Sequence, residues 1–306
     1  MNRNPYELPA VELPTLGLIL ANYLSWFLLL IYGHYFNSLV WILLMGVVTT
    51  LNLSIMHEVV HGHPTRNKLL NRLLLIVPIG WIFPFERFRD THIEHHETGN
   101  LTDPFDDPES WYLAQESWTE SNGVKKALLT FNNTLFGRML IGPIISLGRF
   151  YWSELLLMVT NNKLRSYLIG VWAFHTTSIL LLMYVIKIVS GVPAWQFAVA
   201  VYLGISLLLI RTFLEHQAAE DQSERTVVIE QCCPIAFLFL FNNLHIVHHA
   251  QPGVPWYRLP SFYKHNKNNF LTGDNHYMYS SYAEIFRKFF FRAKEPVSHP
   301  HVAFKR

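Results

Sequence analysis

The 306-residue chain carries little charge. Asp, Glu, Lys and Arg together make up 15% of it, against about 25% in a typical soluble domain. Its formal net charge is only +2, and the clustered Lys and Arg of a nucleic-acid-binding face are missing, so we exclude that class of function. Phe, Trp and Tyr make up another 15%. Low charge combined with many aromatic residues predicts a protein that lies in a lipid bilayer.

Cysteine is scarce as well. The two cysteines, Cys232 and Cys233, are sequence neighbours and cannot form an ordinary disulfide bridge. We expect them to be a buried pair of small apolar side chains in a reducing compartment. Residues 1–14 lack the basic stretch and the small-residue cleavage site of a signal peptide. The first apolar stretch is therefore expected to stay in the mature protein.

Four stretches are apolar and reach the length of about 20 residues that crosses a hydrocarbon core. Short turns join the first to the second and the third to the fourth, which predicts two helical hairpins. Neither turn contains Lys or Arg, whereas the opposite ends of the stretches do. The positive-inside rule then places both termini and the long central segment in the cytoplasm. The predicted spans are residues 15–33, 38–56, 167–186 and 194–214.

Two further apolar stretches, residues 69–85 and 135–158, are interrupted by proline and charged residues. We expect both to lie along the membrane interface, because each lacks an uninterrupted apolar run long enough to cross. Residues 264–275 are expected to form a polar loop. The predicted fold is an all-α integral membrane protein, a single domain over residues 1–306, with interfacial helices and a cytoplasmic helical cap.

Histidine, in contrast, is abundant, with 16 residues. His57 and His61 lie at the cytoplasmic end of the second predicted span, and such an i, i+4 pair shares one face of a helix. An H-x-x-H-H pattern follows twice and places three rings on one stripe of a helical turn, although chance gives roughly 0.04 copies per chain of this composition. We therefore predict that the three clusters bind metal on the cytoplasmic side of the membrane. The second and third clusters are His92, His95 and His96, and His245, His248 and His249.

The other histidines and the nearby carboxylates carry weaker signals. His216 directly follows the fourth span and is either a further ligand or an interface residue. His175 lies inside the third span and stays unassigned, because a helix-to-helix hydrogen bond explains it as well as function does. Metal-bound histidines usually donate their free ring N–H to a carboxylate, and the alternative for each carboxylate is a solvated face. The candidate acceptors are Glu58, Glu94, Glu97 and Glu215.

The remaining histidines are expected to have no part in the site. His34 and His63 are interpreted as structural. The acidic run of residues 103–109 is interpreted as a loop, since Pro104 and Pro108 interrupt it. Solvated tail positions are expected for His265, His276, His299 and His301.

The ligand set narrows the choice of metal. Imidazole suits zinc, copper, iron and nickel, and no cysteine joins the clusters to favour a thiolate site. Eight clustered histidines and His216 exceed the three or four protein ligands that one zinc ion takes, which indicates two metal ions. A redox-active pair of metal ions that reacts with oxygen favours iron, although the ligand types alone also allow copper.

The order H-x-x-x-H, H-x-x-H-H, H-x-x-H-H, with two spans before the first cluster and two between the second and third, resembles the membrane fatty acid desaturases. The resemblance covers residues 38–260, and the stretches HEVVHGHPTRNKLLN (57–71) and NNLHIVHHAQPGVPWYRLP (242–260) are most similar to a bacterial branch. It implies a non-haem diiron centre in a bacterial inner membrane. The centre would use O2 and two electrons to remove two hydrogens from an acyl chain of a fatty acid or lipid.

The resemblance also implies roles and partners. It assigns the metal ligands to the eight clustered histidines and His216, with no catalytic residue beyond them. Electrons would come from a separate protein, such as ferredoxin or a cytochrome b5-like protein with its reductase. Relatives with the same clusters hydroxylate, so a hydroxylase acting on a lipid or hydrocarbon is the alternative within the family.

Two interpretations belong to other classes. The HEVVH sequence of residues 57–61 is also the zincin pattern, in which two histidines bind zinc and Glu58 is the general base. An intramembrane zinc protease would leave both H-x-x-H-H clusters without a role. A metal transporter would place facing polar residues within the spans, where the sequence has few.

Overall fold

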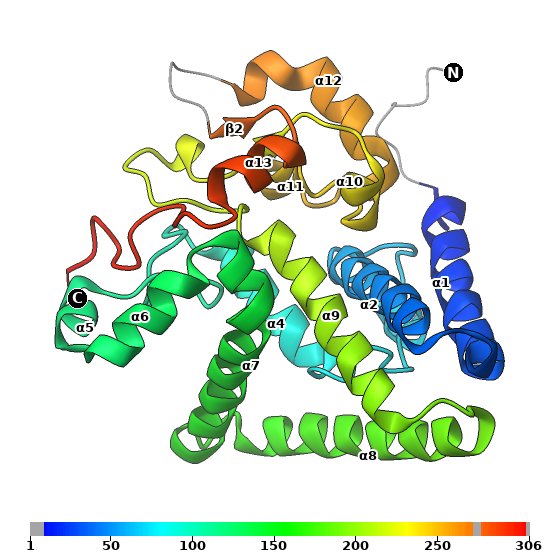
Figure 1. Cartoon of the computed structure of the whole chain (residues 1–306). Coiled ribbons are helices and arrows are strands. Elements are labelled where there is room, and N and C mark those ends of the chain that lie inside the picture. Colours follow the sequence, from blue (N-terminus) through cyan, green and yellow to red (C-terminus); the bar gives the residue numbers. More distant parts are fainter. Residues whose placement is uncertain (1–8, 272–276, 304–306) are drawn as a thin grey trace.

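The computed structural model describes residues 9–271 and 277–303, and most of these residues are helical (Figure 1). Within the described residues, strand is limited to β1 (Val228–Ile229) and β2 (Met278–Tyr279). The two strands pair in parallel, with Val228 opposite Met278. The predicted all-α class is confirmed.

Four helices are long and apolar enough to cross a membrane, and each overlaps one predicted span. The second helix ends four residues beyond the predicted span, so it carries His57 in its last turn, and His61 caps its C-terminal end. One helix thus links the apolar segment of α2 to the first histidine cluster. The four helices are α1 (Leu13–Tyr32), α2 (Ser38–Val60), α8 (Arg165–Val189) and α9 (Ala194–Thr212).

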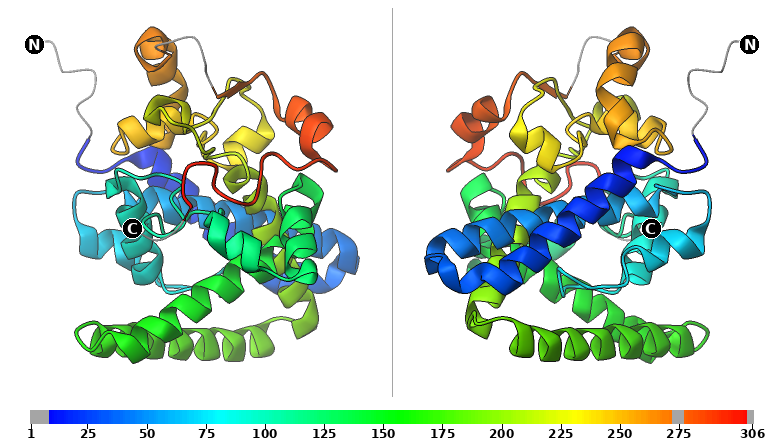
Figure 2. Two further views of the ribbon diagram at one scale, coloured as in Figure 1. Left: turned by 90° about the vertical axis from the view of Figure 1, so that its left-hand side faces the viewer. Right: turned by 90° about the vertical axis from the view of Figure 1, so that its right-hand side faces the viewer.

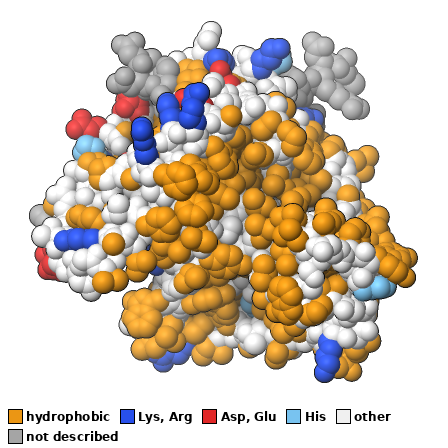
Figure 3. Space-filling model, in the orientation of Figure 1, with side chains coloured by type: hydrophobic (Ala, Val, Ile, Leu, Met, Phe, Trp, Pro, Cys, Tyr) orange, Lys and Arg blue, Asp and Glu red, His pale blue; other side chains and the backbone are white. Residues whose placement is uncertain are grey.

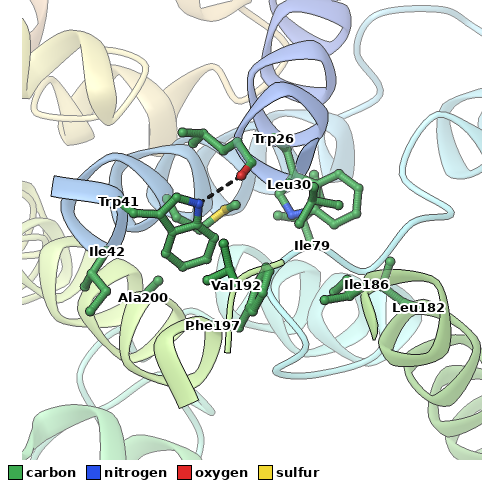
Figure 4. Packing of buried hydrophobic residues seen from close by; sticks show 12 residues of the cluster. Trp26, Leu30, Trp41, Ile42, Ile79, Leu182, Ile186, Val192, Phe197 and Ala200 are labelled. Atoms are coloured by element: carbon green, nitrogen blue, oxygen red, sulfur yellow. Dashed lines mark hydrogen bonds between the residues drawn. The ribbon is translucent and has the colours of Figure 1, made fainter. Parts of the chain in front are cut away.

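The turns of the two predicted hairpins lie side by side. The turn η1 (Gly33–Tyr35) connects α1 to α2, and a Cβ atom on Gly33 would lie only 2.5 Å from the Val192 side chain in the other hairpin. Trp41 fixes this end of the bundle, since its indole N–H donates to the Leu29 carbonyl oxygen at 2.9 Å and its ring contacts Phe197 edge-on (Figure 4).

The closest helix packing joins the two hairpins, where α2 crosses α9. A Cβ atom on Gly204 would lie 2.7 Å from the Thr49 side chain, so glycine lets the two backbones approach. The Thr50 hydroxyl donates to the Gly46 carbonyl oxygen of its own helix at 2.9 Å and lies 3.1 Å from the Gly204 carbonyl oxygen. This crossing sets the relative position of the helix ends that carry His57 and His216.

The two interrupted apolar stretches have different structures. Residues 69–85 form only the short α3 (Lys68–Leu73) and a series of turns before α4 (Phe85–Glu97). Residues 135–158 lie within one long helix, α7 (Leu135–Thr160), which contains Pro143. Neither stretch is among the four helices that are long and apolar enough to cross a membrane. A buried ion pair ties α4 to α7, with Arg87 Nη2 and Glu154 Oε1 2.8 Å apart.

The remaining elements form the cap and the region beside α7. Figure 2 shows the cap above the long helices, with α8 at the opposite side of the molecule. Beside α7 lie α5 (Gln115–Glu120) and α6 (Gly123–Asn132). The cap contains η2 (Gln222–Glu224), α10 (Pro234–Leu238), α11 (His245–Ala250), η3 (Trp256–Arg258), α12 (Leu259–Phe270) and α13 (Tyr282–Phe289).

Two local predictions are wrong. The predicted loop of residues 264–275 is helical as far as Phe270, because α12 buries Tyr263 and Leu259 beneath its polar surface; residues 272–276 lie outside the described part. Cys232 is exposed and Cys233 half-buried, since they precede α10 in a surface segment. The apolar character of cysteine suggested a buried pair, but residue type alone does not show that these two residues lie in a surface segment.

The surface separates into apolar and charged regions. Hydrophobic side chains cover most of the middle of the face in Figure 3, while most charged side chains lie near its edges and over the cap. Many large apolar side chains of α8 are exposed, among them Leu180, Leu181 and Ile188. A soluble protein rarely exposes so large a patch, so this surface supports a membrane setting.

Candidate metal centre

Nine histidines from four parts of the chain meet where the long helices join the cap. The first cluster lies at the end of α2, the second on α4 and the third on α11, while His216 follows α9. All nine are the candidates predicted from the sequence. Eight of them divide into two groups of four, and within each group one nitrogen of every ring lies within 4.8 Å of the others. Group 1 is His57, His61, His92 and His248, and group 2 is His95, His216, His245 and His249.

Each H-x-x-H-H turn is shared between the two groups. The sequence predicts that three rings of one turn point at one place, but α4 gives His92 to group 1 and His95 to group 2. His96 lies between them: its Nε2 is 3.1 Å from His92 Nε2, and its ring stacks on His249 with centroids 4.2 Å apart. The two groups are therefore immediate neighbours.

The hydrogen bonds of group 2 orient ring lone pairs toward one another. His95 Nδ1 lies 2.7 Å from Asp107 Oδ1, and His216 Nδ1 lies 3.3 Å from the Arg225 carbonyl oxygen. Both partners only accept, so each Nδ1 carries the proton and each neutral ring keeps its lone pair on Nε2. His245 Nδ1 likewise donates to Asn242 Oδ1 at 3.1 Å.

These lone pairs face one another at very short range. His216 Nε2 lies 3.0 Å from both His95 Nε2 and His245 Nε2. Burial lowers the pKa of His216 and His245 far below the ordinary value, which keeps both rings neutral. For His95, burial alone would lower the pKa, but Glu109 and Asp107 raise it to about 9. If His95 Nε2 carries a proton, it can donate to His216 Nε2. The contact between His216 Nε2 and His245 Nε2 still brings two lone pairs together.

Group 1 has the same character. His92 Nδ1 lies 2.8 Å from Glu109 Oε1, which leaves the His92 Nε2 lone pair 3.1 Å from His61 Nε2. Burial is the main cause that lowers the pKa of His61 to about 2, so this ring is neutral too. His57 Nε2 is buried without a hydrogen-bond partner among the described residues, as is His249 Nε2 of group 2.

A cation in each group would resolve the conflict. Imidazole nitrogens bind an ion such as zinc at about 2.0–2.1 Å, so two nitrogens on one ion lie about 2.9 Å apart at right angles and about 3.4 Å apart at the tetrahedral angle. The separations of 3.0–3.1 Å between Nε2 atoms lie within this range. The residues present therefore fit two metal ions with nitrogen ligands.

The carboxylates that orient the rings are mostly different from the predicted ones. Glu215 orients His245 only indirectly, because the Asn242 amide donates to Glu215 and accepts from His245. Glu58 accepts from the Trp256 backbone N–H at 2.9 Å and orients no histidine of either group. Glu94 and Glu97 are exposed, and in the described part of the chain neither forms a hydrogen bond or ion pair with a histidine ring.

Asp107 and Glu109 orient rings of both groups, and the sequence did not single them out. Both lie in the acidic run of residues 103–109, which we interpreted as a loop, and the structure shows a loop there. Asp107 is almost fully buried and also accepts from the Thr102 backbone N–H at 2.8 Å. An aspartate that precedes proline in an acidic run, a short distance after a histidine cluster, is the signal that could have found it.

Histidines outside the two groups have separate surroundings. His63 is buried, as expected of a structural residue, with Nδ1 2.6 Å from Glu12 Oε1. His299 was expected to be solvated, which is wrong: it is buried and 3.1 Å from the Thr102 hydroxyl, since the C-terminal segment packs on the acidic loop. His175 is buried and lines a cavity of about 240 Å³. His34, His265 and His301 are exposed, and His276 lies outside the described residues.

A larger cavity of about 460 Å³ reaches the centre, with His92 and His216 both in its wall. Much of the lining comes from an apolar cluster that includes Leu53, Ile82 and Leu209. The cavity therefore brings an apolar compartment to one histidine of each group.

A model of the protein family described as fatty acid desaturase matches residues 34–281. The chain belongs to the fatty acid desaturase family. Among curated proteins, a chloroplastic omega-6 fatty acid desaturase of Arabidopsis thaliana is 24% identical over 282 residues, which cover 83% of this chain and 57% of that protein. The desaturase-family chain thus spans little more than half the length of this relative. The family resemblance predicted from the three histidine clusters is confirmed.

Proposed function

We propose that this chain is an O2-dependent membrane oxidoreductase that desaturates the acyl chain of a fatty acid or lipid. The observation that carries the proposal is the pair of four-histidine groups, whose lone pairs converge next to an apolar cavity. The match to the desaturase family supports it.

The proposed ligands are the nine converging histidines, and the proposed ions are two irons. Iron is favoured over zinc because a redox-active pair gives these neutral ligands a function with O2. When bound, the metal pair supplies the oxidising power that removal of hydrogen from an unactivated chain requires. The proposed ligands are His57, His61, His92, His95, His96, His216, His245, His248 and His249.

Other residues orient the ligands and shape the substrate compartment. Asp107 and Glu109 hold His95 and His92 in the tautomer that leaves Nε2 free for metal. Asn242 does the same for His245 and is itself held by Glu215. The apolar wall of the cavity would exclude water from the chain bound beside His92 and His216.

The rival zinc protease finds no support in the site. Its general base would be Glu58, but the carboxylate accepts from the Trp256 backbone N–H and faces His63, with Oε1 3.8 Å from His63 Nε2. His57 and His61 share their group with His92 and His248, which the zincin pattern does not include.

The cellular setting follows from the same features. We propose a single domain that crosses a bacterial inner membrane four times, with both termini and the metal centre in the cytoplasm. The hairpin turns at Gly33 and Val192 lie together, at the ends of α2 and α9 remote from the histidines. A separate ferredoxin or cytochrome b5-like protein with its reductase would supply the electrons.

The test compares lipids from a host that expresses the chain with a competent reductase under oxygen. Mass spectrometry should show acyl chains lighter by two hydrogens, whereas a gain of one oxygen would mark a hydroxylase. His95→Ala should abolish the product and lower bound iron, while His265→Ala, an exposed histidine outside both groups, should do neither. Unchanged lipids with the wild-type chain would refute the proposed function, and one zinc per chain would refute the diiron centre.

A further inference from the structure

The wall of the large cavity contains three buried polar atoms that the proposed metal centre does not use. They are Arg138 Nη1 on α7, the side-chain oxygen of Asn132 at the end of α6, and the Thr212 hydroxyl at the end of α9. None has a hydrogen-bond partner among the described residues. Buried polar atoms are nearly always paired, because an unpaired one has lost its hydrogen bonds to water without replacement. Three in one cavity indicate a binding site.

Arg138 is the dominant group of this site. Its side chain is 3% exposed, and its Nε donates to the Asn132 carbonyl oxygen at 3.0 Å. The guanidinium carbon lies 3.6 Å from the ring centroid of Trp111, which covers one side of the cation. No ion pair found in the described part of the chain includes Arg138.

A buried cation that forms no ion pair is unfavourable unless something else compensates it. Burial lowers the pKa of Arg138 to about 9, and Glu295, which acts in the opposite direction, forms its ion pair with Lys294 at 2.8 Å. The side chain still carries its charge at neutral pH. An anionic ligand would supply the missing partner.

The space beside Arg138 is kept open by a glycine. A Cβ atom on Gly142 would lie 3.0 Å from Arg138 Cδ and 3.3 Å from Asn132 Oδ1, so these two side chains are adjacent. Arg138 Nη1 can only donate, the Thr212 hydroxyl can donate or accept, and a half-turn of the Asn132 amide exchanges its acceptor for a donor. Arg138 and Asn132, with the Thr212 hydroxyl in the wall of the same cavity, suit a head with several oxygen atoms.

The rest of the cavity is suited to a hydrocarbon chain. Leu53, Ile82 and Leu209 belong to the apolar cluster that lines it, and His92 and His216 stand in the same wall. A ligand with an anionic head at Arg138 and an apolar chain along this wall would pass the metal centre.

We infer that Arg138, Asn132 and Thr212 form a head-group site for an acyl substrate whose head carries anionic oxygen, as a carboxylate or a phosphate. This inference rests on the proposed acyl substrate of the cavity. It selects charged amphiphiles over neutral esters of the same chain length. Arg138 is a specificity-determining residue in this scheme, and it takes no part in the chemistry.

The test measures binding of three C16 probes to the purified, metal-loaded full chain in neutral detergent without reductant. The probes are palmitate, 1-palmitoyl lysophosphatidate and methyl palmitate. A hydrogen bond to a charged group contributes about 1.5–3 kcal/mol, so we expect at least one anionic probe to bind about tenfold more tightly than the methyl ester. Preference for palmitate alone identifies a free fatty acid, and preference for lysophosphatidate alone identifies a phospholipid head.

Variants separate recognition from folding. Arg138→Gln should weaken binding of the preferred anionic probe about tenfold and leave the affinity for methyl palmitate unchanged. Arg138→Lys should recover part of the preference, because it restores charge without the planar fork. Lys125→Gln, which removes an exposed cation from α6, should change nothing.

Equal binding of all three probes by the wild-type chain would overturn the inference, as would an Arg138→Gln variant that keeps the anionic preference. If Arg138→Gln does not fold, the wild-type preference and the partial loss in Arg138→Lys decide the matter. The binding assay needs no turnover. An anionic preference without desaturated lipid would therefore refute the proposed function and leave the head-group site standing.

Discussion

Asp107 offers the sharpest test of how the centre is held together. Its Oδ1 accepts from His95 Nδ1 at 2.7 Å, and both side chains are about 1% exposed. Asp107→Ala would remove a charge-assisted hydrogen bond worth about 1.5–3 kcal/mol. Because each 1.4 kcal/mol is about a factor of ten in an equilibrium constant, we expect iron affinity at group 2 to fall about 10–100-fold, the range found when such ligand-orienting partners are lost.

The assay is iron per chain by elemental analysis after equilibration against a graded series of chelator concentrations. Asp107→Asn keeps an acceptor for His95 but loses the charge, so its affinity should lie between wild type and Asp107→Ala. Asp103→Ala is the matched control. It removes a cap of the same loop, where Asp103 accepts from the Phe105 backbone N–H at 2.8 Å, and among the described residues Asp103 forms no hydrogen bond with a histidine. Equal losses in Asp103→Ala and Asp107→Ala would show that loop stability, and not ring orientation, is what the aspartate supplies.

Two further perturbations test the fold and the metal. Gly204→Leu should lower the free energy of unfolding by about 1–3 kcal/mol through overpacking, because a Cβ atom at this position would already lie 2.7 Å from the Thr49 side chain. Gly170→Leu is the control, since the space around Gly170 is open, and it should leave the thermal midpoint in detergent unchanged. Equal midpoints for the two variants would contradict the close crossing of α2 and α9. Removing metal with a chelator should lower the thermal midpoint by several degrees, since lone pairs 3.0–3.1 Å apart lose the cation between them. Fe²⁺ should restore the midpoint and Ca²⁺, which prefers oxygen ligands, should not; a midpoint that ignores the chelator would count against metal in these groups.

Local patterns sufficed for most elements and for the histidines that converge, but not for the residues that surround them. The apolar runs predicted the four helices that are long and apolar enough to cross a membrane, and the spacing of His92, His95 and His96 put these residues on one helical turn, because both signals depend only on neighbours along the chain. Asp107 and Asn242 lie in non-helical segments, where no sequence periodicity predicts which way a side chain points. Arg138 lies within an interrupted apolar stretch, and its missing partner is visible only when the surrounding helices are in place.

The division of each H-x-x-H-H turn has a consequence for how the protein assembles. Group 1 takes His92 from α4 and His248 from α11, and group 2 takes His95 from α4 and both His245 and His249 from α11. Neither group can be completed while either helix is displaced, so docking of α11 and the cap around it is a requirement of both sites at once. Metal binding and cap packing then stabilise each other through a shared set of contacts. A chain that used one helical turn for each ion could load its sites independently, but this arrangement would make the two sites form together, as the proposed two-metal reaction requires.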